Sequence, residues 1–556
     1  MISIKNLPSG FSIKAESMFI FGVAVFLFTI ALPPEFHSVE ARFLLFAQEM
    51  LRNGPTFFPT TYGAPYPDYT AASTFLIYLV SLPLGKVTPF SAVLPSAIAA
   101  ALILVMVYRT GAIHSRELGF WAVLLCFFTI GFFSMSRGIS PDQYTSLVTI
   151  GSFYLVFFAD ISGRKGRLWL LPLLFMIGFI FRGPIGLVVP AGVVCAYYLI
   201  EKDFKTLLLT GVAALTVLGI GIAGLLAAAK FQGGESFVQD VISWQITSRI
   251  PASAVSAEGF GYYWYHALDR YAVSYPLAIL VVFGYIQEIW RPQNKKHKFL
   301  VHLLGWILIV LGGLSIPGVK KMRYILPAAP AFALLAAHLF IDLQPGKWLA
   351  RIREGFLWLC RYLPVLTGIS CVAALLFWQK IDFGFKPRLF PAVFLMGTIV
   401  IALRIILRRL EEKQSKDMTR LAAATLTFIV LSICFVEPAS YSCTRSEPFV
   451  KKIETLLQQK PGILVFYRQE KDSSAIRFLS IIDKPMRLEF VDSYEEMEKF
   501  RANGYFVLEE KYLNSVLCNK ELQVHVLERG RLAGDDYVFF TFSTDTNRKP
   551  PGQFGS

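Results

Sequence analysis

His37-Ser38-Val39-Glu40-Ala41-Arg42 is the stretch from which the fold of this chain can be worked out. It follows the first apolar run, residues 17–32, and it lies in a segment, residues 33–85, that is rich in aromatics and prolines. The segment also contains the carboxylates Glu40 and Asp68. A polar segment of this composition directly after an apolar run predicts a folded loop at a membrane face rather than a linker.

The loop contains two helical patterns. Phe43, Phe46 and Met50 recur at helical spacing among charged residues, which predicts an amphipathic helix on the membrane surface. Residues 70–84 are apolar but only marginally long enough to span, so we expect an interfacial or re-entrant segment.

The composition indicates an integral membrane protein. Of 556 residues, 54% are hydrophobic and only 17% are charged, and the mean hydropathy is +0.52. The net charge of +15 is explained by Lys and Arg in cytoplasmic loops and near anionic lipid, and the chain has no signature of nucleic-acid binding.

The apolar runs predict about thirteen membrane-spanning helices. After the first run they are 91–108, 118–133, 143–158, 168–181, 184–200, 206–229, 272–289, 299–315, 324–341, 356–378, 389–407 and 421–436. An uncleaved first helix with a cytoplasmic N-terminus places most basic clusters inside, provided that residues 70–84 do not span. The outer clusters at 320–323 and 380–388 break this rule, and an anionic ligand is one reason for such a break.

The chain divides into a membrane domain, residues 1–436, a periplasmic α/β domain, residues 437–543, and a disordered tail, residues 544–556. Predicted strands of the second domain are 463–468, 486–491, 505–508, 522–527 and 537–542, and its predicted helices are 473–482 and 494–501. The fold class is therefore a polytopic α-helical membrane protein with a small C-terminal α/β domain. Cys443 and Cys518 in that domain are either bridged or free, because their spacing does not show proximity.

On the outer face this topology gathers carboxylates, cations and two other polar side chains, which suits transfer from a lipid phosphate. A carboxylate accepts a proton from the acceptor, and Arg or Lys stabilises the departing phosphate. The predicted catalytic residues are Glu40 and Asp142. The predicted substrate-binding residues are Asp68, Arg42, Arg137, Arg182, Gln245, Arg249, Lys320, Lys321, Arg323 and Tyr324.

Structural roles are the alternatives. Glu40 and Arg42 also suit the wet side of an interfacial helix, and Asp142 suits a helix cap. Asp68 suits a turn after proline, and Arg182 suits a side chain that extends from a helix end to the interface. No closely spaced set of metal ligands is present.

These residues resemble those of a known family. Glu40-Ala41-Arg42-Phe43, Gln48-Glu49-Met50, Tyr66-Pro67-Asp68 and Tyr324-Ile325-Leu326-Pro327 are similar to motifs of the bacterial GT-C glycosyltransferases that use polyprenyl-phosphate sugars. The branch is that of the lipid A aminoarabinose transferase within the protein mannosyltransferase superfamily.

The resemblance implies an inverting transferase in the bacterial inner membrane with a periplasmic active site. Its partners would be a polyprenyl-phosphate sugar donor, a glycolipid acceptor (lipid A or lipopolysaccharide core) and membrane lipid. It assigns Glu40, Asp68 and Asp142 to acidic positions and Lys320 to a basic position near the phosphate. Some relatives bind a divalent metal nearby, so the resemblance also offers Asp68, together with Glu40, as a metal ligand. The chain departs from the family at Val39, which stands where an acidic residue often precedes Glu40.

Three alternatives remain: a transporter or flippase of lipid-linked sugars, a transferase acting on protein, and a degenerate transferase that only binds. Transporters commonly show internal repeats and binding residues at the bilayer midplane. We find neither in this sequence, so the transferase is favoured over the transporter.

Overall fold

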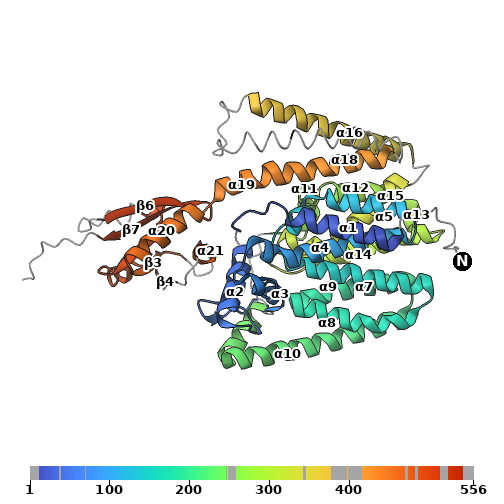
Figure 1. Ribbon diagram of the computed structural model, residues 1–556. Helices are drawn as coiled ribbons and strands as arrows, with labels where there is room; N and C mark the ends of the chain where they lie inside the picture. Colours follow the sequence, from blue (N-terminus) through green and yellow to red (C-terminus); the bar gives the residue numbers. More distant parts are fainter. Residues whose placement is uncertain are drawn as a thin grey trace, which may run out of the picture. The chain divides into compact units, whose positions relative to one another are not determined.

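The computed structural model forms two compact units (Figure 1). The first comprises residues 1–32, 46–382 and 386–435, and the second comprises residues 33–45, 383–385 and 436–556. Within these units the structure describes residues 12–36, 39–68, 70–245, 247, 258–341, 346–376, 397, 416–469, 474–482, 486, 488–513 and 524–542.

The first unit is a bundle of apolar helices. Seven described helices are long and apolar enough to span a membrane, and counting each of two bent pairs as one span gives nine. Its helices are α1 (Ile13–Thr29), α3 (Ala72–Ser81), α4 (Pro89–Ala112), α5 (Arg116–Phe127), α6 (Ile130–Ser136), α7 (Asp142–Ser162), α8 (Leu171–Arg182), α9 (Pro184–Glu201), α10 (Phe204–Gln245), α11 (Tyr262–Arg270), α12 (Ser274–Gly284), α13 (Ile286–Trp290), α14 (Lys295–Ser315), α15 (Ala329–Ile341), α16 (Lys347–Leu376) and α18 (Lys416–Leu431). The chain is thus a polytopic helical membrane protein, as predicted. The total of about thirteen spans stays a prediction, and the span at 389–407 lies outside the described residues.

Two of the predicted spans differ from single straight helices: one is bent, and the other continues beyond its predicted end. Residues 118–133 are not one helix but α5 and α6, which are bent by 74° at Phe128–Thr129. The predicted span 206–229 is the first part of α10, which continues to Gln245 across a break at Gly234. Because Gly234 has φ +72°, a conformation that favours glycine, the chain turns there and goes on as helix where an outer loop was predicted.

The first loop forms helices as predicted. α2 (Val39–Asn53) covers the amphipathic stretch, with Ala41, Phe43 and Ala47 fully or almost fully buried. α3 has ten residues, followed by a 3₁₀ turn at Leu82–Leu84. Helices rise 1.5 Å per residue, so α3 and its turn cover only about 20 Å, less than the ~30 Å of a bilayer core.

The second unit contains a five-stranded mixed sheet in the order β4-β3-β5-β7-β6. Its strands are β3 (Ile463–Tyr467), β4 (Leu488–Val491), β5 (Gly504–Glu509), β6 (Val524–Leu532) and β7 (Asp535–Phe542). β3 pairs in parallel with β4 and β5, whereas β7 is antiparallel to both β5 and β6. All five predicted strands are present, with boundary shifts of a few residues.

Helices of the second unit are α19 (Glu437–Thr444), α20 (Glu447–Gln459), α21 (Ser474–Ile481) and α22 (Tyr494–Glu498). Sequence analysis predicted the last two and missed α20. The signal was available, because Val450, Ile453 and Leu457 follow the spacing of a buried helix face. The possible bridge to Cys518 and the tail 544–556 lie outside the described residues.

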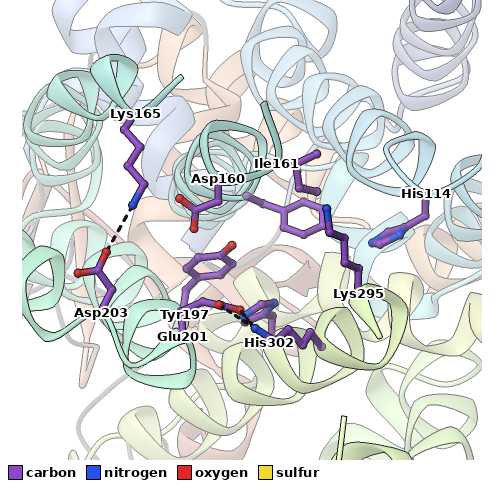
Figure 2. Close-up of a pocket in the computed structure, with 11 residues that line it drawn as sticks. His114, Asp160, Ile161, Lys165, Tyr197, Glu201, Asp203, Lys295 and His302 are labelled. Carbon is purple, nitrogen blue, oxygen red and sulfur yellow. Dashed lines mark hydrogen bonds and ion pairs between the residues drawn. The ribbon is translucent and has the colours of Figure 1, made fainter. Parts of the chain in front are cut away.

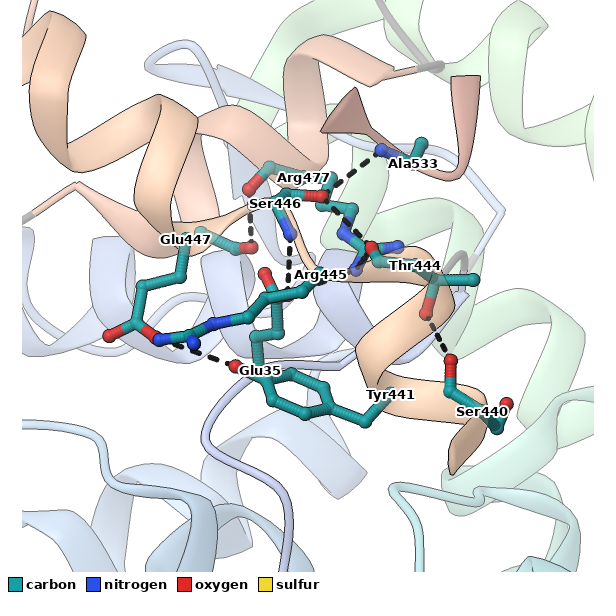
Figure 3. Close-up of polar contacts among 10 residues, drawn as sticks. Glu35, Ser440, Tyr441, Thr444, Arg445, Ser446, Glu447, Arg477 and Ala533 are labelled. Atoms are coloured by element: carbon teal, nitrogen blue, oxygen red, sulfur yellow. Dashed lines mark hydrogen bonds and ion pairs between the residues drawn. The ribbon is translucent and has the colours of Figure 1, made fainter. Parts of the chain in front are cut away.

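The second unit also includes the start of the first loop (Figure 3). Glu35 accepts a hydrogen bond from the backbone N–H of Ser446 at 2.6 Å and forms an ion pair with Arg477 at 3.3 Å. Each of these two charged side chains is only 4% exposed. Residues 33–45 had been assigned to the membrane domain by sequence, but these buried polar contacts join Glu35 to the C-terminal chain.

Candidate active site

Asp142 is the centre of a buried charge cluster in the first unit. It is the first residue of α7, and its side chain is 5% exposed. Its Oδ1 accepts a hydrogen bond from Arg182 Nε at 2.9 Å, and its Oδ2 lies 3.5 Å from Arg323 Nε. Asp142 caps no backbone N–H by a side-chain bond that the structure records, so its role is that of an ion-pair partner.

Local packing fixes the position of Arg182 at the end of α8. Gly178 and Gly186 face each other across the α8–α9 turn, and a Cβ on either would come within 2.0 Å of the other's carbonyl oxygen. Only glycine allows so close a contact. Gly183, with φ +63°, makes the turn directly after Arg182, which sends the chain into Pro184 of α9.

Tyr324 completes the cluster. The guanidinium carbons of both Arg182 and Arg323 lie 5.6 Å from the centre of its ring. This distance is that of a cation–π contact, which keeps the two guanidinium groups near one carboxylate. Two guanidinium groups thus lie close together, and such a pair offers the donors that an anionic ligand requires.

Gln245 joins the first loop to this end of the bundle. Its Nε2 donates to the carbonyl oxygens of Pro67, at 3.1 Å, and Asp68, at 2.9 Å. Its Oε1 lies 3.0 Å from the position that a Cβ on Gly183 would occupy. The amide of Gln245 therefore holds the Asp68 turn close to the residue that follows Arg182. The sequence did not predict this contact, because the apolar run ends at residue 229.

An apolar cavity with a volume of 510 Å³ lies next to this turn, within the size range of small-molecule sites. It is lined by the first loop, α8 and α10, and Phe57, Phe75 and Phe179 are among the side chains that line it. Thr70 Oγ1 donates to the carbonyl oxygen of Ile180 at 2.6 Å, which ties the loop side of the cavity to α8 two residues before Arg182. Sequence reasoning noted the aromatic residues of the loop but did not predict the cavity.

The predicted lysines contact backbone groups. Lys320 is 9% exposed, and its Nζ donates to the carbonyl oxygen of Glu258 at 3.1 Å. The backbone N–H of Lys321 donates to the hydroxyl of Tyr263 at 3.2 Å, and the Lys321 residue is exposed. These bonds hold the segment before Arg323, and phosphate binding by either lysine stays a prediction.

Arg137 holds the end of α1. Its Nη1 donates to the carbonyl oxygen of Leu27 at 2.7 Å, and its Nη2 lies 3.5 Å from that of Ala31. The last carbonyls of a helix have no partner within the helix, so a buried guanidinium group there stabilises the fold. A contact between Arg137 and the substrate stays a prediction.

Replacing Arg137 with Lys should therefore destabilise the first unit by about 1–3 kcal/mol, because an ammonium group cannot reproduce both bonds of the fork. Thermal unfolding followed by tryptophan fluorescence measures this, because the eight tryptophans that the structure describes lie in the first unit. The control is Arg291→Lys, at an exposed position. Equal unfolding temperatures for both variants would contradict the role of Arg137 at α1.

Three predicted residues do not belong to the described part of the first unit. Glu40 and Arg42 belong to the second unit, and Arg249 lies outside the described residues. Among the residues that the structure describes, no group of three or more His, Cys, Asp or Glu side chains is arranged to hold a metal. We therefore assign no step to a metal, and ligation by Asp68 stays a prediction.

Comparison with known proteins adds to this description. Residues 70–228 match the family model described as dolichyl-phosphate-mannose-protein mannosyltransferase. The undecaprenyl phosphate-alpha-4-amino-4-deoxy-L-arabinose arabinosyl transferase of Pseudomonas savastanoi pv. phaseolicola is 26% identical over 58% of this chain and 62% of its own length. An arabinosyl transferase of the same description from Proteus mirabilis is 24% identical over 68% of this chain and 67% of its own length. The match with the first of these relatives thus spans about three fifths of that relative.

The fold is also found in solved structures. The crystal structure of ArnT from Cupriavidus metallidurans bound to undecaprenyl phosphate covers 95% of this chain, with a TM-score of 0.68 and 13% identity. At this identity the likeness establishes the fold. The chain is thus a multi-pass membrane protein with the fold of the GT-C glycosyltransferases, and it resembles the aminoarabinose transferases of that superfamily.

Proposed function

We propose that this protein is an inverting glycosyltransferase that moves a sugar from a polyprenyl-phosphate carrier to an envelope glycolipid. The acceptor we favour is lipid A or the lipopolysaccharide core. The observation that carries the proposal is the Asp142–Arg182–Arg323 cluster, which adjoins the apolar cavity through the bond between Thr70 and Ile180. The similarity to arabinosyl transferases supports the same class of donor.

The two features match the two parts of such a donor. A polyprenyl phosphate has an apolar chain and a phosphate that carries negative charge. The cavity, lined largely by aromatic and aliphatic side chains, suits the isoprene units nearest the phosphate. Arg182 and Arg323 bring two guanidinium groups together, and guanidinium groups bind phosphate oxygens with paired donors.

The chemistry then divides between the carboxylates. Both oxygens of Asp142 face arginines, so we assign it to positioning the guanidinium groups. Glu40 is left as the general base that takes the proton from the acceptor group. The acceptor oxygen forms a bond to the anomeric carbon as the bond from that carbon to the phosphate oxygen breaks, and Arg182 and Arg323 stabilise the charge on the departing phosphate.

The membrane topology follows from loop charges. We place the N-terminus in the cytoplasm and the C-terminal α/β domain in the periplasm of a bacterial inner membrane. The basic residues Arg164, Lys165 and Arg167 after α7, and Lys295, Lys296 and Lys298 at the start of α14, are then cytoplasmic. Asp142 and Arg182, at the other ends of their helices, face the periplasm.

Mass spectrometry of lipid A and core oligosaccharide from cells with and without the gene tests the function. We expect a sugar-sized mass to be lost in the deletion strain and restored by the wild-type gene. If instead a sugar is lost from an envelope protein, the acceptor is protein, which the description of the matching family model also suggests. No change in any glycolipid or glycoprotein would contradict a transferase.

Arg182→Gln tests the cluster within this proposal. Removing a guanidinium group that stabilises a departing phosphate should lower the transfer rate about a hundredfold to a thousandfold. The measurement is turnover of a polyprenyl-phosphate sugar by the purified protein, with Arg291→Gln, an exposed arginine, as the control. A wild-type rate in Arg182→Gln would remove this side chain from the reaction.

A further inference from the structure

A second cavity, of 410 Å³, lies among the ends of α7, α9 and α14 (Figure 2). It is far from Asp142, because Asp160 in its wall and Asp142 stand at opposite ends of α7. They are eighteen residues apart, which at 1.5 Å per residue is about 27 Å along the helix. Since α7 is long and apolar enough to span, this cavity opens at the other membrane face from the candidate active site.

Several charges in this cavity already form ion pairs. Glu201 lies 3.0 Å from His302 Nε2 and 3.1 Å from Lys298 Nζ. Asp203 lies 3.6 Å from Lys165 and also accepts a hydrogen bond from the backbone N–H of Thr206. These pairs account for two of the carboxylates, and they leave Asp160 and Lys295 in the cavity wall.

Asp160 Oδ1 and His302 Nδ1 are buried in the wall and lack a hydrogen-bond partner among the described residues. Asp160 forms a hydrogen bond with the hydroxyl of Tyr197, but its Oδ1 has no partner. His302 is 3% exposed in its side chain, and its Nδ1 has no partner either. When Nε2–H faces Glu201, the neutral imidazole presents Nδ1 as an acceptor. Buried acceptors without donors are costly, so the cavity calls for a ligand that carries N–H or O–H groups.

The other side chains of the wall indicate which chemical class of ligand the cavity binds. Lys295 forms no ion pair with a described residue, and it supplies a positive charge at the exposed rim. Burial, and then the nearby Lys296, lowers the pKa of His114 to about 4, so this side chain is neutral at pH 7 and does not repel a cation. Phe157 and Ile161 add an apolar surface.

We infer that this cavity binds a zwitterion with a primary ammonium group and a phosphate, as in a phosphoethanolamine head group. The ammonium has three N–H donors for Asp160 Oδ1 and His302 Nδ1, and the phosphate pairs with Lys295. Two sources offer this chemistry: phosphatidylethanolamine of the membrane, and soluble glycerophosphoethanolamine. The site is separate from the transferase chemistry and does not depend on it.

Native mass spectrometry of the full-length protein, with matched phospholipids added at equal concentration, tests the inference. Phosphatidylcholine has the same phosphate but no N–H donor, and phosphatidylglycerol has no ammonium. A hydrogen bond to a charged group contributes about 1.5–3 kcal/mol, so we expect phosphatidylethanolamine to be retained at least about tenfold better than either.

Asp160→Asn locates the site. The amide keeps the size of the side chain and an oxygen for Tyr197 but removes the charge, and it should abolish the preference for phosphatidylethanolamine. Asp240→Asn, the same exchange at an exposed residue of α10, is the matched control and should keep the preference. Lys295→Gln, at the exposed rim, should lower retention of all three lipids and serves if Asp160→Asn fails to fold.

Competition with glycerophosphoethanolamine identifies the source. If it displaces the lipid, the free head group is sufficient for binding; if it does not, the acyl chains take part, and both results support the site. Equal retention of phosphatidylcholine and phosphatidylethanolamine by the wild-type protein would overturn the inference. An unchanged preference in Asp160→Asn together with wild-type retention of all three lipids in Lys295→Gln would also overturn it.

Discussion

Glu40→Gln should lower sugar transfer by about a hundredfold to ten-thousandfold and leave binding of the carrier intact. The glutamine has the size of the glutamate but cannot accept a proton, and a general base contributes a factor of this order. Single-turnover transfer from a polyprenyl-phosphate sugar measures the chemical step. Retention of undecaprenyl phosphate by the same protein, measured by native mass spectrometry, reports carrier binding.

Glu49→Gln is the matched control on the same helix. Glu49 Oε1 accepts a hydrogen bond from the backbone N–H of Tyr62 at 2.9 Å, and a glutamine oxygen can accept the same bond. Its transfer rate should therefore stay within a few-fold of wild type. A normal rate in Glu40→Gln would show that the reaction needs no general base at this position. This would be the case if the group that receives the sugar is already ionised. A loss in both variants would indicate damage to α2 instead.

Arg477→Met should destabilise the second unit by about 3 kcal/mol at pH 7, because it leaves the buried carboxylate of Glu35 without its cation. Hydrogen exchange of the backbone amides in β3, measured in the full-length protein, reports this unit. A loss of 3 kcal/mol corresponds to about a hundredfold faster exchange. In Figure 3 the guanidinium group of Arg477 lies between Glu35 and the carbonyl of Thr444, to which it donates at 2.7 Å.

The stability that Arg477→Met removes from the second unit should increase as the pH rises. Burial raises the pKa of Glu35 above its ordinary value of 4.5, against the opposing effects of Ser446 and Arg477. The folded unit therefore binds the Glu35 proton more tightly than the unfolded chain does. The contribution of the Glu35 proton to the stability of the second unit is fully present below the unfolded pKa. It is lost as the pH rises through the folded pKa. Without Arg477 the folded pKa of Glu35 should rise further. The free energy lost between low and neutral pH is therefore larger in Arg477→Met than in the wild-type protein.

Two further variants test the pairing. Glu35→Gln combined with Arg477→Met removes both charges and keeps an acceptor for Ser446, so it should recover most of the lost protection. Glu510→Gln breaks an exposed pair with Arg529, whose side chains are 41% and 59% exposed, and should change protection little. If the double variant is no more protected than Arg477→Met, the loss comes from packing rather than from an unpaired charge.

If Glu40 is the general base of the proposed transferase, then the contacts of Glu35 also affect the position of Glu40. Glu35 stands five residues before Glu40, and it is held by Ser446 and Arg477 of the C-terminal chain. Under the proposed function, transfer by Arg477→Met would therefore report whether the α/β domain positions the start of α2. Partial loss of transfer with full carrier binding is the result that this coupling predicts.

The sequence by itself determined the class of fold and the types of residue in the candidate site. Long apolar runs indicate α4, α7, α9 and α14 as candidate spans, because burial of such runs in lipid depends on composition and length alone. Short continuous apolar runs likewise predicted β3 and β5. Asp142, Arg182 and Arg323 were recognised one by one, because charges at a membrane boundary are costly unless they are paired or used.

Only the tertiary structure decided which of these residues meet. Asp142 and Arg182 are forty residues apart, and Arg323 is a further 141 residues along, so their contact depends on how α7, α8 and the turn before α15 pack. The continuation of α10 to Gln245 depends on a turn at Gly234 that hydropathy does not register. The Glu35–Arg477 pair was equally hidden, since 442 residues separate its members and each alone resembles an ordinary surface charge. Local pattern fixes what each segment becomes, whereas long-range contacts depend on packing between segments, which local sequence does not encode.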